Sequence, residues 1–191
     1  MNLRAAKKAL RQQVRAGRDA IPPAERARLS LAIAERVLAL PEISAAETVM
    51  AFASFGSEVD TRPLLERLAA EGRTVLLPRV EDREIVPVRW TPGMPLGRSA
   101  FGIDEPEGEP VDPAGIDLVI TPGVAFDRSG RRTGYGGGFY DRLFGRLRPG
   151  VPRIAVAFGI QIVDEVPSGG ADRAVDAIVT ESEVIRPALA G

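Results

Sequence analysis

Short apolar runs that alternate with amphipathic segments constrain the fold of this 191-residue chain. Five runs have the length and composition of buried strands: residues 48–53, 74–77, 118–120, 154–158 and 177–179. Helical spacing of apolar residues marks 3–18, the stretch that opens at Pro22-Pro23 and the stretch between Thr61 and Gly72. Strands and helices in alternation are typical of a parallel sheet with helices on its faces. The sequence therefore predicts an α/β fold with a mostly parallel sheet, in a single domain of residues 1–191.

Prolines and glycines interrupt this alternation between residues 78 and 116. Pro78 is expected to end the strand that starts at Thr74, and Pro87 makes residues 85–90 an edge strand, because proline donates no hydrogen bond to a neighbouring strand. Residues 91–116 contain ten prolines and glycines. Such a segment is either an ordered loop that covers a site or a mobile flap, and the sequence leaves both open.

The most informative segment for function follows the run 118–120. Arg131 and Arg132 precede four glycines in the five positions 134–138, and Asp141 follows them. Glycine permits positive φ and lets a ligand approach the backbone closely. Arginine side chains beside bare backbone N–H groups form a cradle for an anion, most often phosphate.

This glycine segment, residues 131–142, differs from the two best-known phosphate-binding loops. No Lys-Ser or Lys-Thr follows the glycines, and Phe139 stands where the third glycine of a dinucleotide fingerprint would be. A flexible linker is the alternative, but aromatic and charged residues flank the glycines in place of Ser/Gly filler. We expect an ordered anion-binding loop that leads into a helix at 139–147.

The composition narrows the chemistry and the partners. The chain has neither cysteine nor histidine, which excludes disulfides, thiolate catalysis, Ser-His-Asp triads and imidazole metal sites. A net charge of −1 favours neither nucleic acid nor acidic lipid. No apolar run reaches the ~18 residues of a membrane span, and the charged N-terminus does not resemble a secretory signal. We expect a cytoplasmic monomer with no nucleic-acid or membrane partner.

Ligand sites of parallel sheets lie at the carboxyl ends of the strands. Glu58 follows the first strand, the glycine segment follows the central strand, and Gln161 follows the next, so these loops are expected to converge. A phosphate cradle before Asp141 suggests a nucleotide with Mg²⁺, which takes one or two protein carboxylates beside phosphate oxygens. The alternative is that Asp141 only caps the next helix. Phosphoryl transfer suits a chain without histidine, because it depends mainly on positioning and charge neutralisation.

Together these residues resemble the 5-formyltetrahydrofolate cyclo-ligase (5,10-methenyltetrahydrofolate synthetase) family over nearly the whole chain. The resemblance rests on residues 7–11, 58–61, 77–79, 105–106, 122–127 and 130–142, and on Gln161, Asp172 and Asp176. Thr133, where an aliphatic residue is expected, and Gly137, where many members carry Lys, depart from the family pattern. The resemblance implies a three-layer αβα, Rossmann-like fold of the NagB/RpiA/CoA-transferase type.

The resemblance also implies a reaction. ATP would phosphorylate the formyl oxygen of 5-formyltetrahydrofolate, and ring closure would give 5,10-methenyltetrahydrofolate, ADP and phosphate. ATP is then a co-substrate and Mg²⁺ a cofactor. Two other functions on the same fold stay open: a folate- or nucleotide-binding protein without turnover, and a sugar-phosphate isomerase-like enzyme.

The family motifs further imply roles for particular residues. The implied ATP-binding residues are Lys7, Lys8, Arg11, Arg132, Gly134, Tyr135, Gly136, Gly137, Gly138, Phe139 and Tyr140. The implied folate-binding residues are Ala53, Glu58, Tyr135, Gly136, Gly137, Gly138 and Phe139; the implied catalytic residues are Arg132 and Tyr140, and the implied metal ligands are Asp141 and Asp172. For Lys7 and Arg11 this replaces a solvated basic face as the interpretation of helix 3–18. Arg4, Arg15 and Arg18 keep that interpretation.

Overall fold

The computed structural model describes residues 2–98 and 102–188. Its α-helices are α1 (Leu3–Asp19), α2 (Pro23–Leu38), α3 (Pro41–Ala45), α4 (Arg62–Ala70) and α5 (Phe139–Phe144). Its strands are β1 (Thr48–Met50), β2 (Thr74–Glu81), β3 (Glu84–Trp90), β4 (Leu96–Arg98), β5 (Asp104–Pro106), β6 (Leu118–Thr121), β7 (Ala125–Asp127), β8 (Arg132–Thr133), β9 (Arg153–Val156), β10 (Ile162–Val163), β11 (Ala177–Val179) and β12 (Val184–Ile185). The 3₁₀ turns η1 (Pro113–Gly115) and η2 (Gly159–Gln161) complete the elements.

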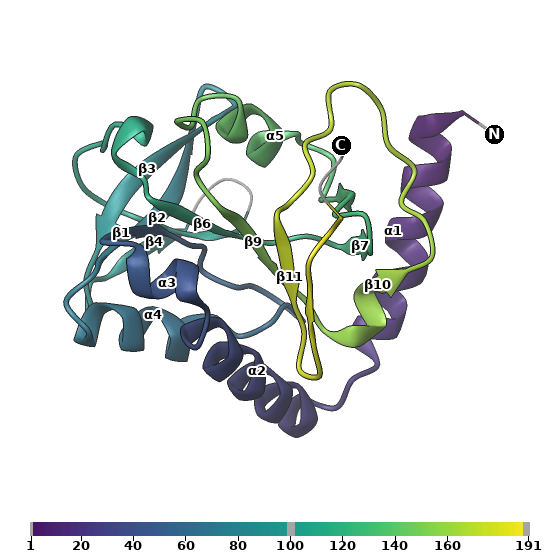
Figure 1. Cartoon of the computed structure of the whole chain (residues 1–191), viewed down its shortest axis with the longest axis horizontal. Coiled ribbons are helices and arrows are strands. Elements are labelled where there is room, and N and C mark those ends of the chain that lie inside the picture. Colours follow the sequence, from purple (N-terminus) through teal and green to yellow (C-terminus); the bar gives the residue numbers. More distant parts are fainter. Residues whose placement is uncertain (1, 99–101, 189–191) are drawn as a thin grey trace.

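A seven-stranded sheet forms the centre of the molecule, in the order β12-β11-β9-β6-β1-β2-β3 (Figure 1). The five inner strands are parallel, whereas β12 and β3 pair antiparallel at the two edges. The chain adds β2 on one side of β1 and then β6, β9 and β11 on the other. The point where this order reverses lies between β1 and β6, and open sheets bind ligands at such a point.

The inner strands are buried on both faces because their apolar residues alternate between two cores. Figure 1 shows α2, α3 and α4 on one side of the sheet and α5 on the other. In β6, Leu118 and Ile120 pack in the core beneath α2 and α4, while Val119 packs in the core that contains Leu143 and Phe144 of α5. The same alternation recurs in β1, β9 and β11. This arrangement confirms the predicted three-layer αβα fold with a mostly parallel sheet.

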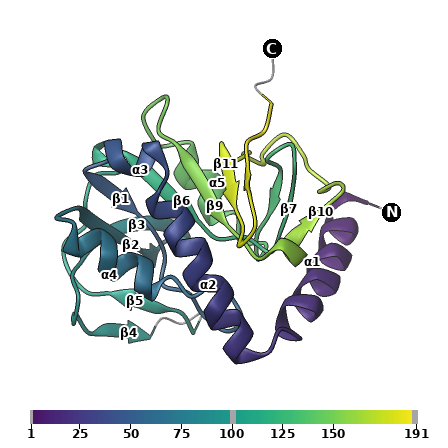
Figure 2. The ribbon, with the colours of Figure 1, turned by 60° about the horizontal axis from the view of Figure 1, so that its bottom comes forward.

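Helix α1 stands apart from these layers, along a second sheet of order β10-β7-β8 (Figures 1 and 2). Its apolar residue Val14 packs with Val124, Ala125 and Val166, and Leu10 borders the same cluster. Gly17 meets η2 closely, since a Cβ at Gly17 would lie 2.8 Å from the Ile160 side chain. The predicted helix at 3–18 is confirmed, and the small sheet fixes its position beside the carboxyl ends of the parallel strands.

The structure corrects several predicted boundaries. The first strand ends at Met50, although Ala51 and Phe52 stay buried, and α5 ends at Phe144 instead of residue 147. Pro78 does not end β2, because it faces Pro87 of β3. Neither proline has an N–H to donate, so the pair fits a position of the antiparallel ladder where no hydrogen bonds are exchanged.

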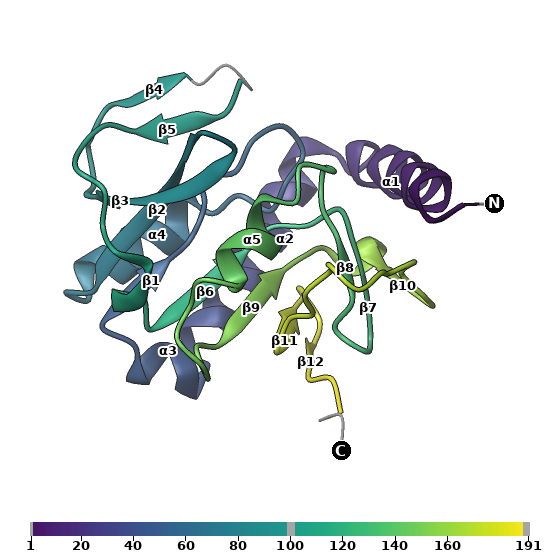
Figure 3. The ribbon, with the colours of Figure 1, turned by 90° about the horizontal axis from the view of Figure 1, so that it is seen from above.

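The segment 91–116 is not a simple loop. Strands β4 and β5 form an antiparallel hairpin within it, which Figure 3 shows projecting beyond β2 and β3. Arg79 of β2 donates to the Gly108 carbonyl, and Glu105 of β5 accepts from the Val80 N–H. Sequence reasoning missed this hairpin because glycine and proline occupy so many of its positions.

We predict that Gly130→Ala destabilises the fold much more than Gly150→Ala. The two glycines have φ of +81° and +82°. A Cβ at Gly130 would lie 2.6 Å from the Val175 carbonyl oxygen, whereas at Gly150 it would meet no atom within 4 Å. The free energy of unfolding in urea should fall by about 2–5 kcal/mol for Gly130→Ala and by about 1 kcal/mol for Gly150→Ala. Equal losses would show that the contact with Val175 contributes nothing.

Candidate active site

The loops that follow β1 and β6 meet at the switch point of the sheet. Glu58 comes from the loop after β1, and the glycine segment begins in the β7–β8 hairpin, which β6 leads into. The Tyr135 hydroxyl donates a hydrogen bond of 2.7 Å to Glu58 Oε1. Two segments that are far apart in sequence are thereby joined, as the sequence predicted from the position of the loops.

A buried aspartate shapes the turn before the glycine segment. Asp127 accepts hydrogen bonds from the Ser129 and Arg131 N–H groups, from the Ser129 hydroxyl and from Arg131 Nε at 2.8 Å. It also accepts from the Val166 N–H at 2.8 Å. Burial opposes ionisation of Asp127, but these hydrogen bonds outweigh it and lower the pKa of the carboxyl group. Asp127 therefore holds the turn and the segment after β10 in one arrangement.

The glycines of the segment are used in different ways. Gly136 and Gly138 have φ of +103° and +66°, in the left-handed region that glycine adopts readily. At Gly137 a Cβ would lie 2.3 Å from the ring of Phe139, so any side chain would displace that ring. The segment is thus an ordered loop, and the prediction that it is not a linker is confirmed in its geometry.

Arg142 fastens this loop to the neighbouring hairpin turn. Its Nη1 donates to the Gly137 carbonyl at 3.0 Å, and its Nε donates to the Arg83 carbonyl of the β2–β3 turn at 3.2 Å. The guanidinium also stacks 5.1 Å from the centre of the Phe139 ring. Sequence reasoning gave Arg142 no role, although it lies directly after Asp141.

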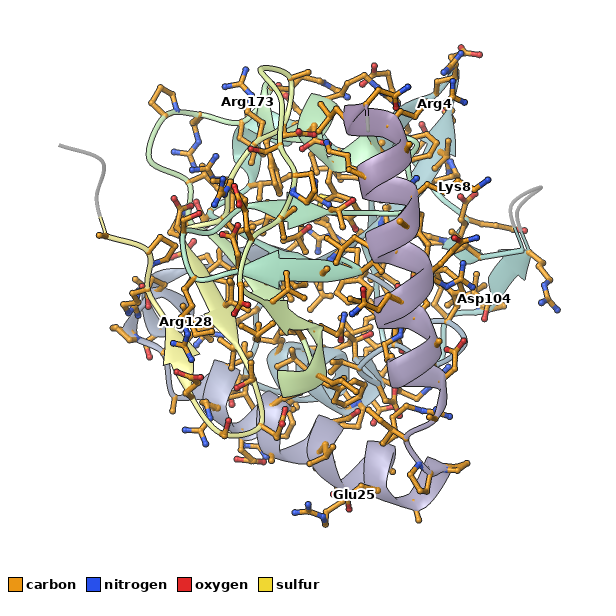
Figure 4. The ribbon with its side chains drawn as sticks, turned by 90° about the vertical axis from the view of Figure 1, so that its right-hand side faces the viewer. Arg4, Lys8, Glu25, Asp104, Arg128 and Arg173 are labelled. Atoms are coloured by element: carbon orange, nitrogen blue, oxygen red, sulfur yellow. The ribbon has the colours of Figure 1, made fainter. Side chains whose placement is uncertain are left out.

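Helix α1 brings cations to the glycine segment. The Arg11 guanidinium lies over Gly136, where a Cβ would be 3.6 Å from Nη1. Lys7 Nζ donates to both carboxylate oxygens of Asp172, at 2.6 and 2.5 Å. Lys8 is exposed and makes no ion pair within the described residues; Figure 4 shows it on the same side of the molecule as Asp104. Lys7 and Arg11 therefore reach the predicted site, and Lys8 does not contact the glycine segment.

The two predicted metal ligands each hold a protein cation. Arg132 Nη2 donates to Asp141 Oδ1 at 3.0 Å, and the backbone N–H of Arg173 donates to the same oxygen at 3.1 Å. Asp172 faces Lys7 in the same way; its burial would raise the pKa, but the Lys7 ammonium and the Gly169 N–H lower it. Asp141 and the residue after Asp172 are thus neighbours, which brings the two carboxylates to one region.

Two buried donors in this region have no partner among the described residues. They are Nε of Arg132 and the hydroxyl of Tyr140. The Tyr140 ring lies 5.7 Å from the Arg132 guanidinium, so both groups belong to one cluster. Burial and the Glu58 carboxylate raise the pKa of Tyr140, which keeps its hydroxyl protonated as a donor. Buried donors without partners commonly mark the place of a ligand or water.

Glu58 is a buried acid, with 6% of its surface exposed. Its Oε1 accepts from Tyr135, and its Oε2 accepts from the Phe55 N–H at 3.0 Å. Burial raises the pKa of Glu58, and the hydrogen bonds and the Arg18 charge oppose this rise. Ala53 lies half-buried on the same loop. The Phe55 and Tyr135 rings, 5.2 Å apart, form a partly exposed aromatic surface beside the carboxylate.

Arg18 is the main residue that sequence reasoning misplaced. We expected a solvated side chain, but only 3% of Arg18 is exposed, and it bonds Ser57 and Tyr135. The spacing of the cations along α1 indicates that Arg18 shares a helix face with Lys7 and Arg11. Positions 7, 11 and 18 are separated by four and seven residues, which places all three on one face of a helix. Val14 on the same face is buried, so this face contacts the protein.

Other polar groups near the sheet ends have structural partners. Gln161 is buried and donates to the Gly123 and Val124 carbonyls, so it ties the loops after β6 and β9 together. A cavity of about 370 Å³ lies at the opposite, amino-terminal end of the strands. Its charged lining residues are already in ion pairs, such as Arg153 with Asp176. We therefore assign the site to the carboxyl ends.

The fold and these residues define an α/β protein with a glycine segment and a cluster of cations at a sheet switch point. The model of the 5-formyltetrahydrofolate cyclo-ligase family matches residues 3–181. The chain is similar to the 5-formyltetrahydrofolate cyclo-ligase of Escherichia coli K12, with 33% identity over 90% of this chain and 98% of that protein. It is also similar to the mouse protein of the same name, with 27% identity over 95% and 96% of the two chains.

A solved structure is also similar to this chain over nearly its whole length. The NMR structure of Aquifex aeolicus 5,10-methenyltetrahydrofolate synthetase has a TM-score of 0.84 and 38% identity, covering 94% of this chain and 92% of that chain. The chain belongs to the 5-formyltetrahydrofolate cyclo-ligase family, which confirms the resemblance seen in the sequence. It is a ligase of one-carbon metabolism whose reaction uses ATP and a reduced folate. No helix in the described ranges has the length and apolar character needed to cross a membrane.

We predict that Asp127→Asn lowers stability by about 2 kcal/mol at pH 7, because the amide replaces an acceptor by a donor and removes the buried carboxylate that pairs with Arg131 Nε. The pKa of Asp127 is lower when folded, so its contribution is complete above the unfolded pKa of about 3.9 and is lost as pH falls through the folded value. Denaturation curves should therefore converge for wild type and variant at low pH. Asp164→Asn, an exposed neighbour, is the control and should match wild type throughout.

Proposed function

We propose that the protein catalyses ATP-dependent cyclisation of 5-formyltetrahydrofolate to 5,10-methenyltetrahydrofolate, with release of ADP and phosphate. The observation that carries this proposal is the Tyr135–Glu58 hydrogen bond, which joins an acid suited to the folate ring to a glycine segment suited to phosphates. An ATP and a folate that bind these two segments would lie against each other. The protein belongs to a family named for this reaction.

We place the ATP phosphates between α1 and the glycine segment. Arg11 lies over Gly136 and pairs with no carboxylate in the described parts of the chain, so its charge is available to a ligand. Lys7 and Arg132 flank it, each now held by an aspartate. The backbone of residues 134–138 would supply N–H donors, with Phe139 and Tyr140 at its end. Lys8 is the weakest member of this set, because it points to solvent.

The residues fit a magnesium ion carried with the nucleotide. Asp141 and Asp172 supply two carboxylates in one region, and Mg²⁺ commonly takes one or two, with phosphate oxygens and waters as the other ligands. No group of three or more acidic residues gathers in the described ranges, which agrees with a metal held largely by the phosphates. When bound, Mg²⁺ would neutralise charge on the transferred phosphoryl group.

The folate ring fits the surface formed by the loop after β1. Both oxygens of Glu58 already accept one hydrogen bond, and each has a further lone pair for the N–H groups of a pterin ring. Phe55 and Tyr135 offer aromatic faces near it, and Ala53 lies on the same loop. We assign Glu58 to orientation of the ring.

The chemistry then needs few protein groups. The formyl oxygen attacks the γ-phosphorus, ADP leaves, and N10 attacks the activated formyl carbon. Cleavage of the carbon–oxygen bond releases phosphate and, after loss of the N10 proton, leaves the methenyl bridge. Nε of Arg132 and the Tyr140 hydroxyl are buried donors without partners, and we assign them to the oxygen that gains negative charge as phosphate leaves.

Residues 1–191 as one domain, a monomeric state and a cytoplasmic location complete the proposal. They stay predictions from the sequence. Family membership supports the ligase over the two alternatives that the sequence left open, a binding protein without turnover and a sugar-phosphate isomerase-like enzyme. The first experiment below tests this choice.

We predict that the purified protein converts 5-formyltetrahydrofolate to the methenyl product only when ATP and Mg²⁺ are both present. The measurement is the absorbance of the methenyl chromophore, with release of ADP followed in parallel. Binding of folate or ATP without product would favour the binding protein. Conversion of a sugar phosphate without ATP would favour the isomerase.

We predict that Arg11→Ala raises the KM for ATP by about 10- to 100-fold, because a hydrogen bond to a charged group contributes about 1.5–3 kcal/mol. The KM for 5-formyltetrahydrofolate should stay within a factor of about three, since Arg11 faces Gly136 and not Glu58. Arg28→Ala is the control, because Arg28 is exposed on α2 and pairs with its helix neighbour Glu25. A change confined to the folate KM would place α1 against the other substrate.

A further inference from the structure

Arg18 is buried at the end of α1, and its guanidinium donates hydrogen bonds to two hydroxyl groups. Nη2 donates to the Tyr135 hydroxyl at 3.1 Å, and Nε donates to Ser57 Oγ at 3.0 Å. No carboxylate forms an ion pair with Arg18 among the residues that the structure describes. A buried charge without a direct counter-ion is costly unless its surroundings use it.

The guanidinium fixes the direction of both hydrogen bonds, because it can donate but cannot accept. Each hydroxyl must therefore use a lone pair toward Arg18, which leaves its own hydrogen for another acceptor. The Tyr135 hydrogen goes to Glu58 Oε1 at 2.7 Å, and the Ser57 hydroxyl donates to Asp19 Oδ1. Arg18 thus sets two chains of hydrogen bonds, each of which ends on a carboxylate.

The Glu58 carboxylate is faced by groups from four segments. They are Arg18 of α1, the Phe55 N–H of its own loop, the Tyr135 hydroxyl of the glycine segment and, at longer range, Tyr140 of α5. Arg18 is the one of these that carries a positive charge. Its charge favours the ionised form of Glu58 against the effect of burial.

We propose that Arg18 is a positioning residue for the folate: it orients the Tyr135 hydroxyl toward Glu58 and so holds the Glu58 carboxylate in place to accept hydrogen bonds from the ring. The proposal rests on the proposed function, because it concerns the same substrate. It gives α1 two tasks, with Arg11 toward the phosphates and Arg18 toward the folate. Arg18 touches neither substrate in this arrangement and acts through Tyr135 and Glu58.

The test uses Arg18→Ala, Arg18→Lys, Tyr135→Phe and the surface control Arg28→Ala in the full chain. For each protein, kcat and the KM values for 5-formyltetrahydrofolate and ATP are measured from pH 5 to 9. Binding of 5-formyltetrahydrofolate without ATP is measured by calorimetry, and the unfolding temperature is recorded. The calorimetry separates folate binding from turnover, so that a failure of the reaction is not taken for a failure of this proposal.

Arg18→Ala should weaken 5-formyltetrahydrofolate binding by at least about 10-fold and leave the ATP KM within about threefold. The acid limb of kcat/KM for the folate should move to higher pH, because loss of the positive charge raises the pKa of Glu58. Arg18→Lys should restore the acid limb but only part of the affinity, since one ammonium does not reproduce the planar fork that reaches both hydroxyls.

Tyr135→Phe covers the case in which Arg18→Ala fails to fold, because Tyr135 is 40% exposed and its loss leaves Arg18 in place. It should move the acid limb in the same direction, since its hydrogen bond also favours the ionised form of Glu58. Three results would overturn the proposal. They are equal losses of affinity for folate and ATP, a lower unfolding temperature with no change in folate binding, and an acid limb of kcat/KM that stays at the wild-type pH. Wild-type protein that binds no 5-formyltetrahydrofolate would overturn the proposed function and this inference with it.

Discussion

The site depends on pairing between cations and carboxylates that come from different parts of the chain. Arg132 is buried and needs a counter-ion, which Asp141 supplies at 3.0 Å. Lys7 and Asp172 form the second pair at 2.5 Å and connect α1 to the segment after β10. These pairs hold the glycine segment, α1 and residues 164–176 in one arrangement. They also give Lys7 and Arg132 partners of opposite charge within the protein itself.

Nucleotide binding would then be an exchange of partners. A phosphate can take the place of each aspartate beside its cation, and the metal can take the place of each cation beside its aspartate. In such an exchange each cation and each aspartate keeps a neighbour of opposite charge. For this reason neither the metal alone nor the phosphates alone would be expected to replace both protein pairs well.

The fold was largely predictable because its main signals are local. The apolar run Leu118-Val119-Ile120 predicts a strand buried on both faces, and the structure places these residues in two different cores. The failures have equally physical causes. Pro78 stays in a strand only because Pro87 lies opposite, and that pairing is not visible from either residue alone. The β4–β5 hairpin was missed because its glycines and prolines hide the strand pattern, and its contact with β2, through Glu105 and Val80, is not visible in the sequence.

The site was predicted in part. The position of loops after parallel strands indicated that Glu58 and the glycine segment would converge, and the Tyr135–Glu58 bond shows that they do. The partners of individual charges were not predictable, because they lie far apart in sequence. Because α1 docks on the small sheet, Lys7 reaches Asp172, and Arg18 reaches Tyr135 and Ser57. From sequence alone, a helical face with several cations is predicted to be exposed to solvent, and only the structure shows which protein groups it contacts.

The prolines near the sheet edges also affect whether another chain can add a strand there. A long edge strand with free N–H groups invites pairing with another chain, and thus aggregation. Here β3 carries Pro87, whose carbonyl is already occupied by the Val111 N–H. At the other edge β12 is only two residues long and is followed by Arg186 and Pro187. Both borders of the large sheet are thereby poor templates for strand addition, which disfavours aggregation by edge-to-edge strand pairing.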